Sequence, residues 1–411
     1  MRVIFQDPAF AFQLLRTIGS TYYGGVDIGE CLSTAYRIKE GDFESWYTEW
    51  LATAERVSNY GDNSLSAGHK VSAREAYLRA SNYYRNAEFF LHTNPQDPRI
   101  IETWQKSIDS FKKAAQLFVP YKVEFVEIPY EGTSIPGCFY KVDDNDTSSP
   151  SSKPKPTLIL HTGFDGTQEE LYVTSVIAAL DRGYNCLTFE GPGQGRVIRK
   201  QKIPFRYDWE KVVIPVIDFV VGNYEKQCDL KRLALMGVSM GGYLAARAAA
   251  FEHRIGACIL DDGVYDIYEN FMEKLGTLSN AVAQGNATVV NTAIETSMYF
   301  DTGIRWIMSH GMWVFNAKDP LDFIQKNKDY TLKDVADNIE SPTLVLEAQM
   351  DDDFPGGPKK LYDVLKCPKK YVLFTAEEGA EDHCQVAALS LSNQRIFDWL
   401  DEVFKNSIDH T

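Results

Sequence analysis

The sequence of 411 residues has no run of about twenty apolar residues, the length that a helix needs to span a bilayer. Basic residues are fewer than acidic ones: the sequence has 42 Lys and Arg and 57 Asp and Glu, which gives a net charge of -15. Polyanions repel a protein of this charge. We therefore expect neither a nucleic acid nor a membrane as a partner.

Cysteine is scarce and scattered. The seven cysteines are odd in number, no two have C-x-x-C spacing, and none lies in a cluster suited to zinc. This usage is typical of a reduced protein without a disulfide framework. The first residues, MRVIFQDPAFAFQLLR, have an acid and a proline where a secretion signal would have its apolar segment. We expect a cytoplasmic protein with no metal site.

Phosphate-binding motifs are missing as well. FEGPGQGR, residues 189–196, is rich in glycine but lacks the G-K-[ST] ending of a P-loop and does not match G-x-G-x-x-G. We interpret this stretch as a tight turn beside an active site. No nucleotide or other cofactor is expected.

Residues 1–121 predict a helical N-terminal domain. VSAREAYLRASNYYRNAEFFL, like the segments before and after it, has apolar and aromatic residues at helical spacing with charges between them. We interpret most of these aromatic side chains as core between helices. The domain is a candidate lid or dimerisation domain, and its apolar helices are compatible with a homodimer.

Residues 122–411 predict an α/β domain. YKVEFVEIPYEG and SIPGCFYKV favour an antiparallel strand pair. After a polar, proline-rich loop at 143–156, short apolar strands alternate with helical segments, which is typical of a mostly parallel sheet covered by helices. The alternation breaks at about 265–335, where we expect a helical insertion over the strand ends.

One of these strands stops at a serine enclosed by glycines. Gly237-Val238-Ser239-Met240-Gly241 has the G-x-S-x-G form of a nucleophile elbow, and a helical segment follows at once. Small neighbours are needed because the serine of such a turn has a strained backbone. The motif predicts Ser239 as a nucleophile, and the alternative is a serine that only caps the helix.

A serine nucleophile needs a base, and in sheets of this kind the base is a histidine late in the chain. His383 follows the last predicted strand, in EEGAEDHCQ, and is the candidate base. His253 falls on the next helix, His310 in the inserted segment and His410 in the C-terminal tail. These three positions fit the role less well.

The acid that orients the base is expected after the strand PTLVLEA. Three aspartates compete there. Asp351 is favoured because it stands three residues beyond Ala348, the end of that strand, while Asp352 and then Asp353 remain alternatives. Such an acid fixes the histidine tautomer and stabilises the imidazolium.

The developing oxyanion needs hydrogen-bond donors. The loop HTGFDGTQEE follows the strand at 157–160 and is rich in backbone N–H groups. Gly163 and Phe164, with the amide of Met240 after the nucleophile, form the predicted oxyanion hole.

These motifs together resemble one known family. HTGFDGTQEE, FEGPGQG, GVSMGGYLAARAAA, PTLVLEAQMDDDF and EEGAEDHCQ resemble the α/β-hydrolase family of 2,6-dihydroxypseudooxynicotine hydrolase, and fungal heptaketide pyrone (yellowish-green pigment) hydrolases are similar. The resemblance extends over the N-terminal half. It implies an α/β-hydrolase fold with a helical N-terminal domain, an active site between the two domains, and cofactor-free cleavage of a carbon–carbon bond next to a ketone or shortening of an acyl chain.

Carried over position by position, the resemblance implies Ser239 as nucleophile, His383 as base and Asp351 as acid. Two positions depart from the family pattern: Thr162 stands where many hydrolases have glycine, and Arg196 where an acid is common. The implied substrate is an acyl or ketone group of an aromatic or polyketide-like metabolite. An esterase, lactonase or thioesterase would use the same triad, and a binding or cyclase scaffold would keep the fold without hydrolysis.

Carbon–carbon cleavage also needs a proton donor for the departing carbon. His383, protonated during the attack, fits this role. Asp262, Asp266 and Glu269, in LDDGVYDIYENF, are further candidates. The alternative for each of them is a solvated or capping carboxylate.

Overall fold

A computed structural model describes residue 1, residues 3–142 and residues 153–409, with side chains up to residue 405. Most of the proline-rich loop predicted at 143–156 lies outside the described residues, as does His410. The chain divides into two compact units, which are described one at a time. The first comprises Met1–Val119 with Leu275–Lys326, and the second comprises Pro120–Lys274 with Asn327–Thr411.

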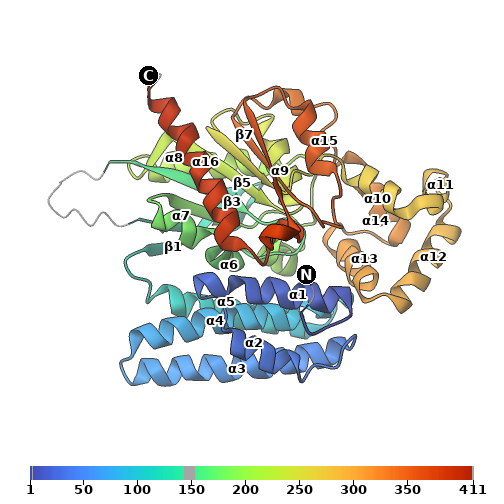
Figure 1. The fold of residues 1–411 in the computed structure, drawn as a ribbon, viewed down its shortest axis with the longest axis horizontal. Coiled ribbons are helices and arrows are strands. Elements are labelled where there is room, and N and C mark those ends of the chain that lie inside the picture. Colours follow the sequence, from blue (N-terminus) through green and yellow to red (C-terminus); the bar gives the residue numbers. More distant parts are fainter. Residues whose placement is uncertain (2, 143–152, 410–411) are drawn as a thin grey trace. The chain divides into compact units, whose positions relative to one another are not determined.

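The first unit is helical. Its α-helices are α1 (Pro8–Gly19), α2 (Ile28–Ala35), α3 (Phe43–Ser66), α4 (Lys70–Glu88), α5 (Pro98–Ala115), α11 (Ser279–Ala283), α12 (Ala287–Phe300), α13 (Thr302–Val314) and α14 (Pro320–Lys326). Helices α3, α4 and α5 lie side by side (Figure 1). Aspartates begin several of the helices, because their carboxylates accept hydrogen bonds from backbone N–H groups of the first turn. They are Asp7, Asp27, Asp42 and Asp97.

Aromatic side chains form the core of this unit. Four of them on α3 and α4 have no exposed surface: Trp46, Trp50, Tyr77 and Tyr83. The prediction that the helical aromatic residues are core is confirmed. The inserted helices share this core, since the Trp306 ring on α13 stacks on the Phe89 ring at 4.3 Å and its Nε1 donates to the Phe89 carbonyl at 2.9 Å.

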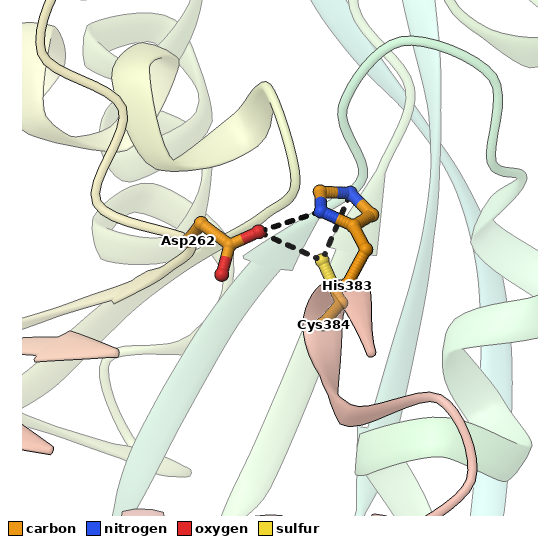
Figure 2. Close-up of side chains that lie close together, drawn as sticks. All are labelled: Asp262, His383 and Cys384. Atoms are coloured by element: carbon orange, nitrogen blue, oxygen red, sulfur yellow. Dashed lines mark hydrogen bonds and ion pairs between the residues drawn. The ribbon is translucent and has the colours of Figure 1, made fainter. Parts of the chain in front are cut away.

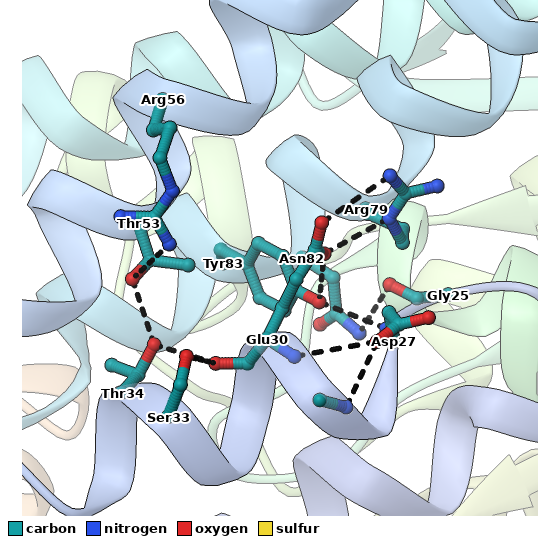
Figure 3. A network of polar contacts seen from close by, with 11 residues as sticks. Gly25, Asp27, Glu30, Ser33, Thr34, Thr53, Arg56, Arg79, Asn82 and Tyr83 are labelled. Atoms are coloured by element: carbon teal, nitrogen blue, oxygen red, sulfur yellow. Dashed lines mark hydrogen bonds and ion pairs between the residues drawn. The ribbon is translucent and has the colours of Figure 1, made fainter.

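A polar network joins α2 to α4 (Figure 3). The Tyr83 hydroxyl donates to Glu30 Oε2 at 2.7 Å and accepts a hydrogen bond from the Asp27 amide at 2.9 Å. Arg79 donates to both oxygens of the same carboxylate, at 3.0 and 3.4 Å. The network satisfies polar groups beside an apolar core, where an unpaired group would cost stability.

The second unit contains an eight-stranded sheet of order β1-β2-β4-β3-β5-β6-β7-β8. The strands are β1 (Lys122–Tyr130), β2 (Thr133–Lys141), β3 (Lys155–His161), β4 (Asn185–Phe189), β5 (Cys228–Val238), β6 (Ala257–Asp261), β7 (Thr343–Ala348) and β8 (Lys369–Phe374). β2 pairs antiparallel with β1 and with β4, and the remaining neighbours are parallel. The predicted fold class, a mostly parallel sheet with an antiparallel pair, is confirmed.

Helices cover this sheet, and all residues of β4 and β6 are buried. The α-helices are α6 (Gln168–Leu171), α7 (Ile177–Asp181), α8 (Glu210–Tyr224), α9 (Gly241–Ala249), α10 (Ile267–Leu275), α15 (Gly357–Val364) and α16 (Leu389–Asp409). α9 packs on β5, β6 and α8, and α16 contacts β6 and the π-helical segment Tyr172–Val176. Among the described residues, no helix combines the length and the apolar character that a membrane span requires.

The stretch between β6 and β7 holds helices α10 to α14, and part of it belongs to the first unit. Because β3 and β5 to β8 run parallel, their carboxyl ends meet at one edge of the sheet. The loops that carry the predicted site residues all leave from this edge.

Candidate active site

Ser239 stands at a sharp turn between β5 and α9. Its φ of 63° lies in the left-handed region, which non-glycine residues rarely adopt. The turn is tight enough that a Cβ atom at Gly237 would lie 1.9 Å from the Gly241 carbonyl oxygen. Glycine at 237 therefore permits the turn, as the G-x-S-x-G motif predicts, and Ser239 itself stays half-buried and reachable.

The imidazole of His383 joins the serine to an aspartate. His383 Nε2 lies 2.8 Å from Ser239 Oγ, and Nδ1 lies 2.8 Å from Asp351 Oδ2. His383 begins a 3₁₀ turn, His383–Gln385, after β8, and Asp351 lies three residues beyond the end of β7. The structure thus brings Ser239, His383 and Asp351 together in the order that the sequence predicted.

The two alternative aspartates lie elsewhere. Asp352 is exposed to solvent. Asp353 is on the other side of the imidazole, with Oδ2 3.8 Å from His383 Nε2 and 44% of its side chain exposed. Its backbone amide donates to Asp351 Oδ1 at 2.7 Å, which helps to orient that carboxylate. Of the three, only Asp351 bonds Nδ1.

The other candidate histidines that the structure describes, His253 and His310, are not part of this arrangement. His253 is largely exposed, 3.6 Å from a carboxylate oxygen of Glu340. His310 is buried on α13 of the first unit, where its ring stacks on Trp306 and His92, each at 4.9 Å between ring centres. His410 lies outside the described residues.

The pKa values of Asp351 and His383 are shifted in opposite directions by their contact. Burial alone would raise the pKa of Asp351, but the charge of His383 and the hydrogen bonds from His383 and Asp262 outweigh it and hold that pKa below its usual range. Burial would likewise lower the pKa of His383, yet the charge of Asp351 raises it well above 6.5. The pair therefore favours an imidazolium beside a carboxylate, the state that forms when His383 takes the serine proton.

The loop after β3 approaches the nucleophile turn closely. A Cβ atom at Gly163 would lie 2.7 Å from the amide nitrogens of Met240 and Gly241. Gly163, with Phe164 following it, therefore lies against the start of α9, as an oxyanion hole with Met240 requires. Thr162 contributes its side chain within the loop, donating from Oγ1 to the Gly166 carbonyl at 3.2 Å.

Two residues that hold this loop were missed at the level of sequence. The Gln194 side chain donates from Nε2 to the carbonyls of Thr162 and Gly163, at 2.6 and 3.1 Å. The buried carboxyl of Glu190 accepts hydrogen bonds from the amides of Gln168 and Arg196, at 3.1 and 2.7 Å. The glycine-rich turn thus holds the loop in place through these hydrogen bonds. The sequence signal for this role was the presence of polar Glu190 and Gln194 in an otherwise apolar, buried segment.

Asp262 and Cys384 were not assigned to the triad, but they lie beside His383 (Figure 2). Asp262 Oδ2 is 2.8 Å from His383 Nδ1, and Cys384 Sγ is 3.3 Å from Nε2. Burial raises the pKa of the Cys384 thiol well above its ordinary value, so it stays protonated and does not compete with the serine. The signal for Asp262 was an aspartate directly after a buried strand.

The remaining predicted donors have structural partners. Asp266 pairs with Lys333 at 3.1 Å and accepts the Glu269 amide at 2.7 Å, which caps α10, and Glu269 pairs with Lys333 and Lys360 at 3.5 and 3.6 Å. Arg196 donates to Glu127 Oε1 at 2.6 Å. We therefore assign Asp266 the capping role and Glu269 the role of a solvated, ion-paired carboxylate, the two alternatives that the sequence left open.

Two sets of side chains have the geometry to ligate a metal ion: Asp262, His383 and Cys384, and Asp351, Asp353 and His383. Both sets use His383, whose two ring nitrogens are hydrogen-bonded to Ser239 and Asp351. A metal at either set would compete with the serine or the aspartate for the imidazole. The described donor atoms therefore fit the triad better than a metal centre.

Comparison with known proteins agrees with this geometry. Residues 158–395 match the Alpha/beta hydrolase family. The chain belongs to this family. It is 36% identical to Hydrolase acrC of Aspergillus aculeatus, over 96% of each chain, and 36% identical to 20-hydroxy-prefusarin hydrolase FUS2 of Gibberella moniliformis, over 98% of each.

A solved structure supports the fold of the α/β hydrolase chain over nearly its whole length. The crystal structure of 2,6-dihydroxy-pseudo-oxynicotine hydrolase superposes with a TM-score of 0.72 at 22% identity, covering 94% of this chain and 95% of that one. The resemblance inferred from the motifs is confirmed. The protein is a hydrolase of this family.

Proposed function

We propose that this protein is a cofactor-independent serine hydrolase that cleaves an acyl carbon–carbon bond next to a ketone in an aromatic or polyketide-like metabolite. The observation that carries the proposal is the position of His383, with Nε2 2.8 Å from Ser239 Oγ and Nδ1 2.8 Å from Asp351 Oδ2. The relative named 20-hydroxy-prefusarin hydrolase supports a complex metabolite as the substrate class.

In the first step, Ser239 Oγ attacks the ketone carbon while His383 Nε2 takes the hydroxyl proton. The carbonyl oxygen becomes an oxyanion that accepts hydrogen bonds from the amides near Gly163 and Met240. Asp351 stabilises the imidazolium from the Nδ1 side.

In the second step, the carbon–carbon bond breaks and its electron pair stays on the departing carbon. That carbon takes the proton from His383 Nε2, which leaves an acyl-serine. Water then attacks the acyl carbon while His383 Nε2 takes a proton from it. The bond between the acyl carbon and Ser239 Oγ breaks, His383 returns the proton to Oγ, and the acid is released. Asp353 Oδ2 lies 3.8 Å from His383 Nε2, the nitrogen that carries the transferred proton.

The test is hydrolysis of a panel of aryl 1,3-diketones and matched aryl esters in water labelled with ¹⁸O. Carbon–carbon cleavage of a diketone releases a ketone and an acid that carries ¹⁸O from water. Ester cleavage releases an alcohol or phenol and an acid that carries ¹⁸O. Formation of the ketone and the labelled acid from the diketones supports the proposal, and turnover of the esters alone replaces it with an esterase, lactonase or thioesterase.

The control is Ser239→Ala, assayed at the same protein concentration after its fold has been checked by circular dichroism. Loss of turnover in this variant assigns the reaction to the serine. Retained turnover of either substrate class would overturn the proposed mechanism.

A further inference from the structure

Two aspartates from neighbouring strands meet the same nitrogen of His383. Asp262 directly follows β6, Asp351 follows β7, and these strands are adjacent and parallel. His383 Nδ1 lies 2.8 Å from Oδ2 of each carboxyl group. The imidazole therefore has two acidic partners on its Nδ1 side.

The position of Asp262 is fixed by the nucleophile turn itself. The Ser239 amide donates to the Asp261 carbonyl, and a Cβ atom at Gly242 would lie 1.5 Å from the Asp262 carbonyl oxygen. The backbone of the turn thus packs directly on the segment that carries Asp262. A shift of this backbone segment would have to move the serine as well.

Five acidic groups lie around this imidazole, and they cannot all be ionised at low cost. Asp262, Asp351 and Asp261 are buried, and Asp353 and the Cys384 thiol complete the surroundings. A single imidazolium compensates for one buried carboxylate, and a second buried negative charge without a partner is strongly unfavourable. One of the two carboxyl groups at Nδ1 therefore holds a proton.

The proton belongs on Asp262. Asp262 has no exposed surface, and its Oδ1 has no hydrogen-bond partner among the described residues, which a neutral group tolerates better than a charged one. Asp351 Oδ1 accepts hydrogen bonds from the amides of Asp353 and Phe354, at 2.7 and 3.4 Å, which favour the charged form of this carboxyl group. Burial and the charge of Asp351 raise the pKa of Asp262 well above its usual range, in agreement with this assignment.

We propose that Asp262 is a second, neutral acid that positions His383, and that it becomes the orienting carboxylate when Asp351 is removed. The inference rests on the proposed serine mechanism. In the wild type, the Asp262 carboxyl donates to Asp351 and holds the imidazole from the β6 side. When Asp351 is neutralised, the repulsion that kept Asp262 protonated is gone, and its carboxylate accepts the Nδ1 hydrogen instead.

The experiment measures the rate at which a small fluorophosphonate labels Ser239, followed by intact mass in four full-length proteins. They are the wild type, Asp351→Asn, Asp351→Asn/Asp262→Asn and the matched control Asp351→Asn/Asp352→Asn, in which the second aspartate is exposed. Where a single carboxylate orients the imidazole, its replacement by the amide lowers the rate about 10⁴-fold. We expect a loss of about 10²-fold for Asp351→Asn and the control, and about 10⁴-fold only for the variant without Asp262.

A pH series separates positioning from a merely structural role. In Asp351→Asn, labelling should rise with pH in two steps, as Asp262 ionises and as His383 loses its proton, and only the His383 step should remain when Asp262 is also asparagine. Equal rates for Asp351→Asn and Asp351→Asn/Asp262→Asn, or an equal further loss in the control, would overturn the inference. Failure of the wild type to react at all would instead count against the proposed function, so the two failures are distinguishable.

Discussion

A Cβ atom at Gly163 would lie 2.7 Å from the amide nitrogen of Met240, so these two residues leave room for nothing larger than a hydrogen atom between them. Gly163 belongs to the loop after β3, and Met240 follows the candidate nucleophile. Their closeness is what brings two segments of backbone N–H groups to one position. The predicted oxyanion hole depends on it.

Gly163→Ala should therefore impair catalysis more than folding. The added methyl group must push the loop away from the turn, and loss of one oxyanion donor typically lowers kcat by about 10²- to 10³-fold. The matched control is Gly222→Ala on α8, where an added Cβ atom meets nothing within 4 Å. Because alanine favours a helix more than glycine does, this variant should raise the free energy of unfolding by up to about 1 kcal/mol. Steady-state kinetics and denaturant unfolding of both variants are the measurements. Full kcat in Gly163→Ala would contradict the predicted oxyanion hole.

Ser239 and His383 should act as one unit. Ser239→Ala and His383→Ala are each expected to lose nearly all turnover, and the double variant should lose little more, because neither group works without the other. The measurement is kcat/KM for the three variants on one substrate. Additive losses would show that the two residues contribute independently.

The pH profile should reflect the environment of His383. Its neutral form takes the serine proton, and Asp351 raises its pKa, so kcat/KM should fall as pH decreases through a midpoint above 6.5. The same shift means that the protonated imidazole stabilises the fold at low pH, and that this contribution is lost as pH rises through the raised pKa. A kinetic midpoint at or below 6.5 would contradict the assignment.

Tyr83→Phe should destabilise the helical unit. The variant removes the hydroxyl that donates to Glu30 and accepts from the Asp27 amide, in a side chain with no exposed surface. We expect a decrease of about 1–3 kcal/mol in the free energy of unfolding, measured by urea titration. Tyr36→Phe, at a side chain that is 76% exposed, is the control and should change it by less than about 0.5 kcal/mol. An equal effect of the two variants would show that the hydrogen bonds of Tyr83 do not stabilise the fold.

The strands could be predicted because each is a short apolar run that ends at turn residues. PTLILHTG predicted a strand at 157–160, and β3 extends over Lys155–His161. Ser239 and His383 could also be predicted to lie close together, because each follows the carboxyl end of a strand and these ends meet at one edge of the sheet. The homodimer and the cytoplasmic location stay predictions.

What the sequence could not predict depends on neighbours in space. Gln194 braces carbonyl groups about thirty residues earlier in the chain, and no local pattern reports such a contact. Asp262 was visible as an aspartate at a strand end, but its contact with His383 arises only once β6 and β7 pair and the turn after β8 folds back. The local periodicity of the sequence predicts the helices and strands. Which aspartates contact the imidazole depends on how the strands pair in space.

All seven cysteine thiols are free and buried, and they are spread over both units of the chain. Cys31 belongs to the helical unit, whereas the other six belong to the unit with the sheet. A thiol reagent therefore reacts at each position only after the surrounding structure has opened. The rate at Cys31, compared with the rates at the other cysteines, gives the opening equilibrium of one unit separately from that of the other, with no substitution in the chain.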